Sequence, residues 1–143
     1  MQIALVCDLR LASKKALLGF DEIKLGFLPG MATWRLAKYV GLGRARALTA
    51  GGRILNGIEA EDWGLIDHAI GADDLHDTLQ SIIRDSQPVH RIAIELNRRL
   101  LNESYAIQYE DAIGNLLAAQ HRAIISEPFQ KLLTETRRGG RDD

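Results

Sequence analysis

The chain has 143 residues, of which 46% are hydrophobic and 26% charged, and its formal net charge is −1. This composition supports a folded core of ordinary domain size, and the near-neutral charge gives no electrostatic reason to expect a nucleic-acid or membrane partner. The single cysteine, Cys7, excludes an internal disulfide and a thiolate metal cluster. It also fits a reducing compartment, so we expect a cytoplasmic protein. No run approaches the roughly 20 apolar residues of a membrane span.

The first thirty residues are apolar and are interrupted by turn-forming residues. Residues 3–7 lack the basic flank and cleavage pattern of a secretory signal, so we expect a buried element there. Residues 9–12 and 16–20 predict two short strands joined by a polar turn. Two strands cannot form an independent sheet, so we expect them to need partners that this chain does not supply. Residues 21–30 predict a loop, because the segment ends in a Pro-Gly turn signal.

From residue 31 onward, the spacing of apolar residues predicts mainly helices. The first should run from Thr33 to about Val40, where Gly41 ends it, and a second should cover residues 43–50. A short helix is predicted at 59–63, followed by an extended segment at 65–70. Four further helices are predicted: from Asp73 or Asp74 to 83, from Pro88 to 100, from about 105 to 125, and from Pro128 to 133. In the helix over 105–125, an inward-facing stripe is predicted from Tyr109, Ile113, Leu116, Leu117 and Ile124.

An ordered series of motifs runs through residues 7–67. It consists of Cys7-Asp8-Leu9-Arg10-Leu11-Ala12-Ser13, Gly19-Phe20-Asp21-Glu22-Ile23-Lys24-Leu25-Gly26, Phe27-Leu28-Pro29-Gly30, Arg35-Leu36, Val40-Gly41, Gly52-Arg53-Ile54 and Glu59-Ala60-Glu61-Asp62-Trp63-Gly64-Leu65-Ile66-Asp67. In order and spacing, this series resembles the crotonase (enoyl-CoA hydratase/isomerase) family. The resemblance implies an α/β chain, the C-terminal portion of the ClpP/crotonase spiral fold, mostly helical with two or three short strands.

The same resemblance implies a division into three parts. Residues 1–72 would be the remainder of the crotonase core, 73–136 a C-terminal helical oligomerisation region, and 137–143 a disordered tail. Complete family chains are much longer, and their upstream half carries both backbone amides of the oxyanion hole. We therefore expect this chain to be the C-terminal half of such a protein, and its status as an enzyme on its own is left open.

Glu22 is the candidate catalytic residue. Chemistry beside a thioester carbonyl needs a group that moves a proton and donors for the oxyanion that develops. Glu22 matches the family's catalytic glutamate, although Asp21 precedes it where the family has proline. By composition alone, such a glutamate would be a solvated surface residue. The family's second hydratase glutamate falls at Gln2, six residues before Asp8. An amide cannot exchange a proton at neutral pH, so this departure favours a one-carboxylate isomerase over a hydratase.

The family's acyl-binding loop falls at Pro29, Gly30, Met31 and Trp34, which are the predicted substrate-binding residues. Met31 and Trp34 make this loop bulkier than the family pattern; alternatively, both side chains fill the core. No metal is expected, because the four histidines have no ligand spacing. No separate cofactor is expected either, since CoA would arrive as part of the substrate.

The resemblance thus implies an enoyl-CoA hydratase/isomerase-like protein, a lyase or isomerase of fatty acid metabolism that acts on an acyl-CoA thioester by carboxylate proton transfer. It also implies a homo-oligomer, a trimer or hexamer. The alternative is a non-catalytic fragment or assembly module of a crotonase-family protein. A helix-turn-helix DNA binder around residues 33–50 is a weaker third hypothesis, because the chain lacks a basic recognition helix.

Overall fold

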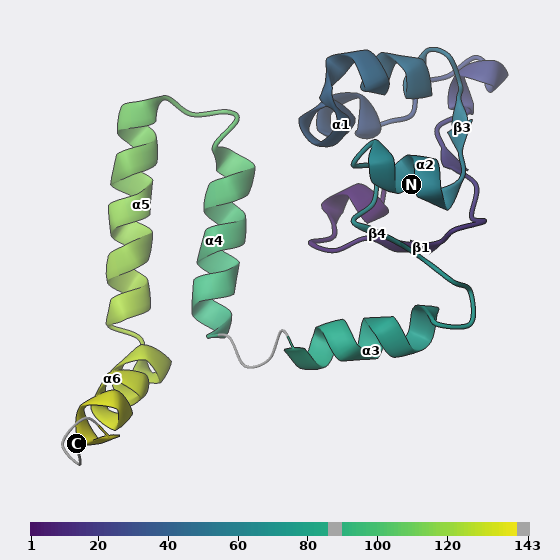
Figure 1. Cartoon of the computed structure of the whole chain (residues 1–143). Coiled ribbons are helices and arrows are strands. Elements are labelled where there is room, and N and C mark those ends of the chain that lie inside the picture. The colour runs from purple at the N-terminus through teal and green to yellow at the C-terminus, as the bar shows by residue number, and fades with distance from the viewer. Residues whose placement is uncertain (86–89, 140–143) are drawn as a thin grey trace. The chain divides into compact units, whose positions relative to one another are not determined.

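A computed structural model of the chain describes residues 1–85 and 90–139. The chain forms two compact units, residues 1–85 and residues 86–143, which we call unit 1 and unit 2. Helices predominate in both, and the strands are short (Figure 1). The predicted mostly helical α/β chain is therefore confirmed. None of the described helices is long and apolar enough to cross a membrane.

Four short strands of unit 1 form two pairs among the described residues: β1 (Leu11–Ser13) with β4 (His68–Ile70), in parallel, and β2 (Leu18–Gly19) with β3 (Ile54–Leu55), antiparallel. The two strands predicted from the first twenty residues thus exist, but they do not pair with each other. The expectation that the chain supplies no partners for them is wrong. Each finds one partner strand later in unit 1, because the extended segment after α2 and the connector before α2 return to them.

The helical elements of unit 1 are η1 (Ala4–Val6), η2 (Glu22–Leu25), α1 (Ala32–Thr49), α2 (Gly57–Asp62) and α3 (Leu75–Asp85). The two helices predicted over 33–50 form α1, which is kinked where Gly41 adopts φ 77° and ψ 159°. Glycine has no Cβ, so it takes this conformation at little steric cost. The position that sequence reasoning took as a helix end is therefore a bend.

A capping box begins α2. The Glu59 N–H donates to Asn56 Oδ1 at 3.0 Å, and the Asn56 N–H donates to Glu59 Oε2 at 3.0 Å. These two bonds satisfy donors that a helix start otherwise leaves without partners. The Asn-x-x-Glu spacing is a recognised sequence signal of a helix start, and it places the beginning of α2 two residues earlier than the segment predicted at 59–63.

The core of unit 1 is one apolar cluster, to which η1, β1, α1, β3 and α2 contribute. Its buried members are Leu5, Ala12, Phe20, Ala32, Leu36, Val40, Ala45, Leu48, Leu55, Ala60, Leu65 and Ile66. The prediction that residues 3–7 form a buried element is wrong for most of that run. Leu5 is buried, but Ile3 and Val6 are exposed, because a single 3₁₀ turn with three residues per turn directs only one of them inward.

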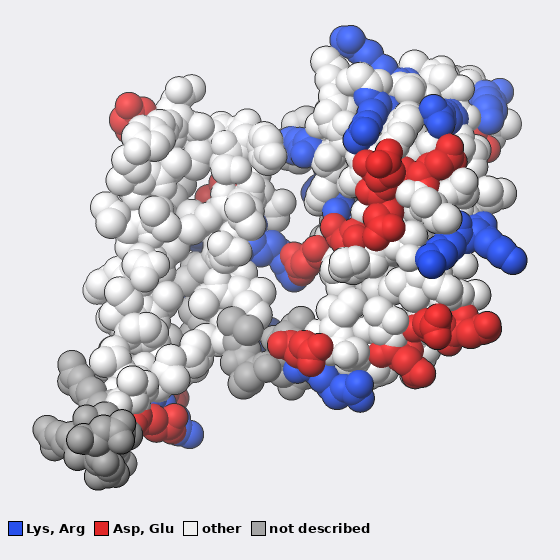
Figure 2. Space-filling view, viewed as in Figure 1, with Lys and Arg blue, Asp and Glu red and all other residues white. Residues whose placement is uncertain are grey.

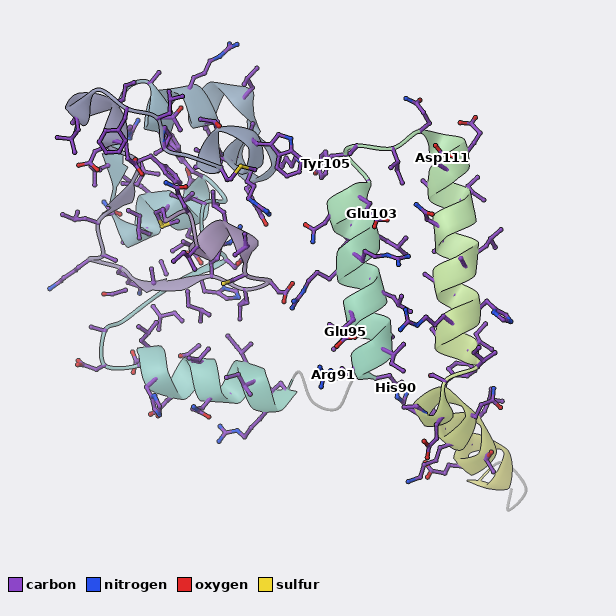
Figure 3. All side chains as sticks on the ribbon, turned by 180° about the vertical axis from the view of Figure 1, so that it is seen from behind. His90, Arg91, Glu95, Glu103, Tyr105 and Asp111 are labelled. Atoms are coloured by element: carbon purple, nitrogen blue, oxygen red, sulfur yellow. The ribbon has the colours of Figure 1, made fainter. Side chains whose placement is uncertain are left out.

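Unit 2 consists of α4 (Arg91–Glu103), α5 (Tyr109–Ile124) and α6 (Glu127–Gly139). Helices α4 and α5 lie side by side, joined by a short loop (Figures 1 and 3). On α4, Arg91 and Glu95 form an ion pair of 2.7 Å one helical turn apart, both labelled in Figure 3. The predicted helix start at Pro88 lies outside the described residues, as do residues 140–143 of the predicted tail.

The predicted inward stripe of α5 is exposed in this chain. Its members are Tyr109, Ile113, Leu116, Leu117 and Ile124. The buried residue of this helix is Ala119. Within unit 2, α5 packs against α4 and α6, and one neighbouring helix covers only a narrow stripe of another. The spacing of apolar residues thus predicted the helix correctly, but much of the apolar face of α5 has no neighbouring helix to cover it within the described part of unit 2.

Candidate functional site

Three segments of unit 1 meet around Glu22. Glu22 begins η2 and is half-buried. The side-chain amide of Gln2, just before η1, donates from Nε2 to Glu22 Oε1 at 3.2 Å. The third segment is the turn at Gly30, where φ is 47°. A Cβ atom at this position would lie 2.5 Å from Gln2 Oε1, so a larger residue would displace the end of the Gln2 side chain.

The two oxygens of the Glu22 carboxylate differ in their surroundings. Oε1 accepts the bond from Gln2. Oε2 is buried and has no hydrogen-bond partner among the residues that the structure describes. Leaving a buried acceptor without a donor costs free energy, and such a group therefore calls for an explanation. Chemically, the arrangement holds one oxygen in place and leaves the other, buried oxygen without a hydrogen-bond donor among the described residues.

An ion pair joins Arg10, which precedes β1, to Asp67, which precedes β4. Asp67 Oδ2 accepts from the Arg10 backbone N–H at 2.7 Å and from Nε at 3.2 Å, and Oδ1 accepts from Nη2 at 2.9 Å. Burial of the carboxyl group alone would raise its pKa. The hydrogen bonds and charge of Arg10 outweigh this and lower the pKa of Asp67 below its usual value.

The buried guanidinium of Arg10 also connects the strands to η1. Its Cζ lies 4.0 Å from the centroid of the Tyr39 ring on α1. The Tyr39 hydroxyl donates to the Leu5 carbonyl at 3.1 Å. Leu5 is fully buried in η1, the turn that directly follows Gln2. Arg10, Asp67 and Tyr39 therefore fix the backbone from which Gln2 reaches Glu22.

The predicted substrate-binding residues divide into two kinds. Pro29 is buried, and Gly30 contacts the Gln2 side chain as described. Met31 is 59% exposed and Trp34 49% exposed, so the alternative that both fill the core is wrong. They lie on the solvent-facing side at the start of α1. The structure thus brings Gly30 into the Glu22 cluster and places Met31 and Trp34 at the surface beside it.

The ring of Trp34 is covered on one face by a basic side chain. Lys38 Nζ lies 3.0 Å from the ring centroid, one helical turn further along α1. Desolvation and, secondly, the charge of Arg35 lower the pKa of Lys38. The ammonium group is attracted to the π face of the ring, an interaction that is weak at an exposed site.

Sequence reasoning missed the roles of Arg10, Asp67 and Tyr39. Arg10 and Asp67 both belong to the motif series, and a signal for their pairing existed. An arginine flanked by leucines at the start of a predicted strand is expected to be buried, and a buried arginine needs an acidic partner. The sequence separation of 57 residues gives no local indication of which acid that is.

Charges on the visible face of unit 1 are mixed in sign (Figure 2), in keeping with the net charge of −1. Across residues 1–85 and 90–139, no three His, Cys, Asp or Glu side chains come together in a way that could hold a metal ion.

Comparison with known proteins identifies the family. The sequence matches the enoyl-CoA hydratase/isomerase family over residues 1–136. The chain therefore belongs to this family, the crotonase family that the motif series predicted. The match includes residues 33–50, so it replaces the helix-turn-helix hypothesis for that segment.

Individual relatives are similar over part of their length. A protein named as a probable enoyl-CoA hydratase of Mycobacterium leprae (strain TN) is 34% identical over 105 residues, which are 73% of this chain and 41% of the relative. An enoyl-CoA isomerase/hydratase of Mycosarcoma maydis is 34% identical over 96 residues, 66% of this chain and 35% of the relative. The chain thus spans less than half the length of these relatives.

Solved structures show the same fold. The enoyl-CoA hydratase from Bacillus anthracis superimposes with a TM-score of 0.87 at 24% identity, covering 96% of this chain and 54% of that chain. The enoyl-CoA hydratase/isomerase from Cupriavidus metallidurans CH34 has a TM-score of 0.83 at 26% identity, covering 93% of this chain and 52% of that one. The predicted C-terminal portion of the crotonase fold is therefore confirmed.

Proposed function

We propose that this chain supplies the proton-transfer carboxylate, Glu22, of a site that acts on an acyl-CoA thioester. One observation carries the proposal. The carboxylate of Glu22 is half-buried, with Oε1 held by Gln2 and with Oε2 buried and without a partner among the described residues. A solvated surface glutamate would have both oxygens in water. A carboxylate held in this way is suited to exchange a proton with a bound substrate.

The chemistry follows from the thioester. Removing a proton from the carbon next to the carbonyl places negative charge on the thioester oxygen, which donors must stabilise. Glu22 would take that proton and return it, and the CoA moiety would be part of the substrate. Because the net change is a relocation of protons, the reaction requires no separate metal or redox cofactor.

Of the two reactions named for the family, the arrangement favours the double-bond shift. Glu22 Oε2 removes the proton next to the carbonyl of a 3-enoyl thioester, and the electron pair of that C–H bond is delocalised over the oxygen and the chain. The same proton then returns to the carbon at the far end of the former double bond, which gives the 2-enoyl thioester. One exchangeable carboxylate suffices for this sequence, and Gln2 offers no second one.

The test uses a hybrid, because the chain spans less than half the length of its curated relatives and the oxyanion donors are expected from the part that precedes it in the family. This chain is joined downstream of the upstream part of the Mycobacterium leprae relative, at the point where the two align. Isomerisation, hydration and deuterium incorporation next to the thioester carbonyl are then measured with short acyl-CoA and enoyl-CoA substrates.

We expect Glu22→Gln to lower the isomerisation and deuterium-exchange rates of the hybrid by about 10²–10⁴-fold, the usual contribution of a general acid or base. Asp21→Asn is the matched control. It removes the same charge from the neighbouring exposed residue and should leave both rates unchanged. A hybrid that folds by circular dichroism and is equally active with and without the Glu22 carboxylate would refute the proposal.

The second candidate is an assembly module that self-associates without turnover. The observation that favours it is the exposed apolar stripe of α5, which includes Leu116 and Leu117. Because a homo-oligomer would cover the apolar stripe of α5, we propose a trimer or hexamer formed through unit 2. We also propose that the protein lies in the cytoplasm. Sedimentation of the full chain, compared with Leu116→Glu and Leu117→Glu, tests this. A monomer for all three would refute self-association, and Ala118→Glu is the control on a neighbouring exposed position.

A further inference from the structure

We infer that Gln2 is a positioning residue that orients the Glu22 carboxylate and leaves Oε2 as the oxygen that exchanges the proton. This inference rests on the proposed function of Glu22 and adds to it a second residue with a defined role. It starts from the 3.2 Å bond between Gln2 Nε2 and Glu22 Oε1 and from the burial of Oε2 without a partner among the described residues.

The direction of the hydrogen bond follows from the chemistry of the two groups. An ionised carboxylate has no proton to donate, so the amide must present its nitrogen to it. A hydrogen bond to a charged acceptor is stronger than one between neutral groups. The Gln2 amide therefore restrains the carboxylate of Glu22 through Oε1. Oε2, the other oxygen of the same carboxylate, points away from the amide. Because the amide itself does not titrate, it provides this restraint at any pH near neutrality.

The Gln2 side chain is itself restrained from two sides. The backbone turn at Gly30 approaches its Oε1 so closely that a Cβ atom there would collide with it at 2.5 Å. The backbone of η1 is held by the Tyr39 hydroxyl on the Leu5 carbonyl and by the Leu5 N–H, which donates to the Met1 carbonyl at 3.2 Å. The Gln2 side chain thus lies against the turn at Gly30, and the backbone turn after Gln2 is held by hydrogen bonds. A positioning group needs such surroundings if it is to restrain another side chain.

Two substitutions at Gln2 separate positioning from simple packing. Gln2→Met keeps the length of the side chain and removes the donor. Gln2→Glu also removes the donor when its carboxylate is ionised, but a protonated glutamic acid can donate one hydrogen bond again. Positioning therefore predicts that the second variant recovers function as the pH falls, whereas the first does not. A packing role predicts no such difference between the two variants.

The hydrogen bond is tested first on the full chain, without any assay of activity. The side-chain amide signals of Gln2 are assigned in ¹⁵N NMR spectra by their loss in Gln2→Met. We expect these signals to move in Glu22→Gln and to stay in place in Asp21→Asn, which changes the charge of the adjacent residue only. Gln2 signals that are the same in wild type and Glu22→Gln would overturn the inference, because the two side chains would not be in contact.

The role in proton transfer is tested in the hybrid by deuterium exchange next to the thioester carbonyl. We expect Gln2→Met to lower kcat about tenfold, as for the loss of one hydrogen bond to a charged group, with KM changed less than about twofold. Gln80→Met, an exposed position on α3, is the control and should leave kcat unchanged. For Gln2→Glu, the ratio of its kcat to that of the wild type should fall as the pH rises.

The outcomes distinguish the inference from the function on which it rests. The positioning role is overturned if the NMR signals of Gln2 respond to Glu22→Gln but the Gln2→Met hybrid has the kcat of the wild type. In that case Glu22 remains the base. A folded hybrid that does not exchange deuterium overturns the function of Glu22 and with it the catalytic part of the inference. A loss of kcat that is the same in Gln2→Met and Gln2→Glu at every pH indicates packing and overturns positioning.

Discussion

The ion pair between Arg10 and Asp67 should make a large contribution to the stability of unit 1. Asp67→Asn keeps the shape of the side chain but removes the charge, and its NH₂ group replaces one of the two oxygens that accept from Arg10 at 2.7–3.2 Å. Removing one partner of a buried ion pair costs about 3–5 kcal/mol. The Arg10 side chain is 7% exposed but that of Asp67 is 32% exposed, so water compensates in part. We therefore expect a loss of about 2–3 kcal/mol.

Urea unfolding of the full chain, followed by tryptophan fluorescence, measures this loss. Both tryptophans, Trp34 and Trp63, belong to unit 1, so the signal reports on the unit that contains the ion pair. With a slope of about 1 kcal/mol/M for a small unit, the midpoint should fall by about 2–3 M. Glu61→Gln is the control, since its 3.9 Å contact with His68 is exposed and should be worth less than about 0.5 kcal/mol.

The pH dependence of the same difference has a definite sign. Because Arg10 lowers the pKa of Asp67 in the folded state, the stabilisation is fully present above the unfolded value of about 3.9 and is lost as the pH falls through the lower folded value. The difference between wild type and Asp67→Asn should be constant from neutral pH to about pH 4 and shrink below it. A difference that is no larger than that of Glu61→Gln at neutral pH would refute the reasoning.

Four further substitutions test the glycines and the helix cap. Gly57→Ala should destabilise unit 1 by about 1–3 kcal/mol in the same urea assay, since the new Cβ would collide with the Ser13 carbonyl. Gly43→Ala on α1 should instead stabilise unit 1 by about 0.5–1 kcal/mol, because a Cβ at this position meets open space. Asn56→Ala should cost about 1 kcal/mol by removing the cap of α2, and an unchanged urea midpoint would contradict the capping role. Gly30→Ala should shift the Gln2 amide signals in ¹⁵N spectra, because the new Cβ takes the space of Gln2 Oε1; signals that stay in place would contradict that contact.

Much of the fold could be predicted from local signals. The helices of α1 and α5 follow from the spacing of apolar residues, and the Pro-Gly turn and Gly41 mark changes of direction at the positions expected. The pairing of strands could not be predicted in this way. The partners of β1 and β2 lie more than thirty residues away along the chain, in β4 and β3, and short strands carry too little pattern to identify a distant partner.

The candidate site shows the same limit. Glu22 and Gly30 were found because they belong to motifs with fixed spacing, and Gln2 because it occupies the position of a second family carboxylate. That Gln2 contacts both of them depends on the fold, which brings together residues 20 positions apart. The sequence near an apolar helix position also does not show whether a neighbouring helix covers that position. The exposed stripe on α5 has the spacing of a buried one, and only the number of neighbouring helices decides the outcome.

The amide at position 2 also has a genetic consequence. Glutamine and glutamate codons differ only in their first base, so a single nucleotide change would place two acids side by side where one acid and one amide now meet at 3.2 Å. Their mutual repulsion would then make the protonation of each depend on the other. One base at this codon thus decides whether the Glu22 carboxylate faces an amide or a second acid.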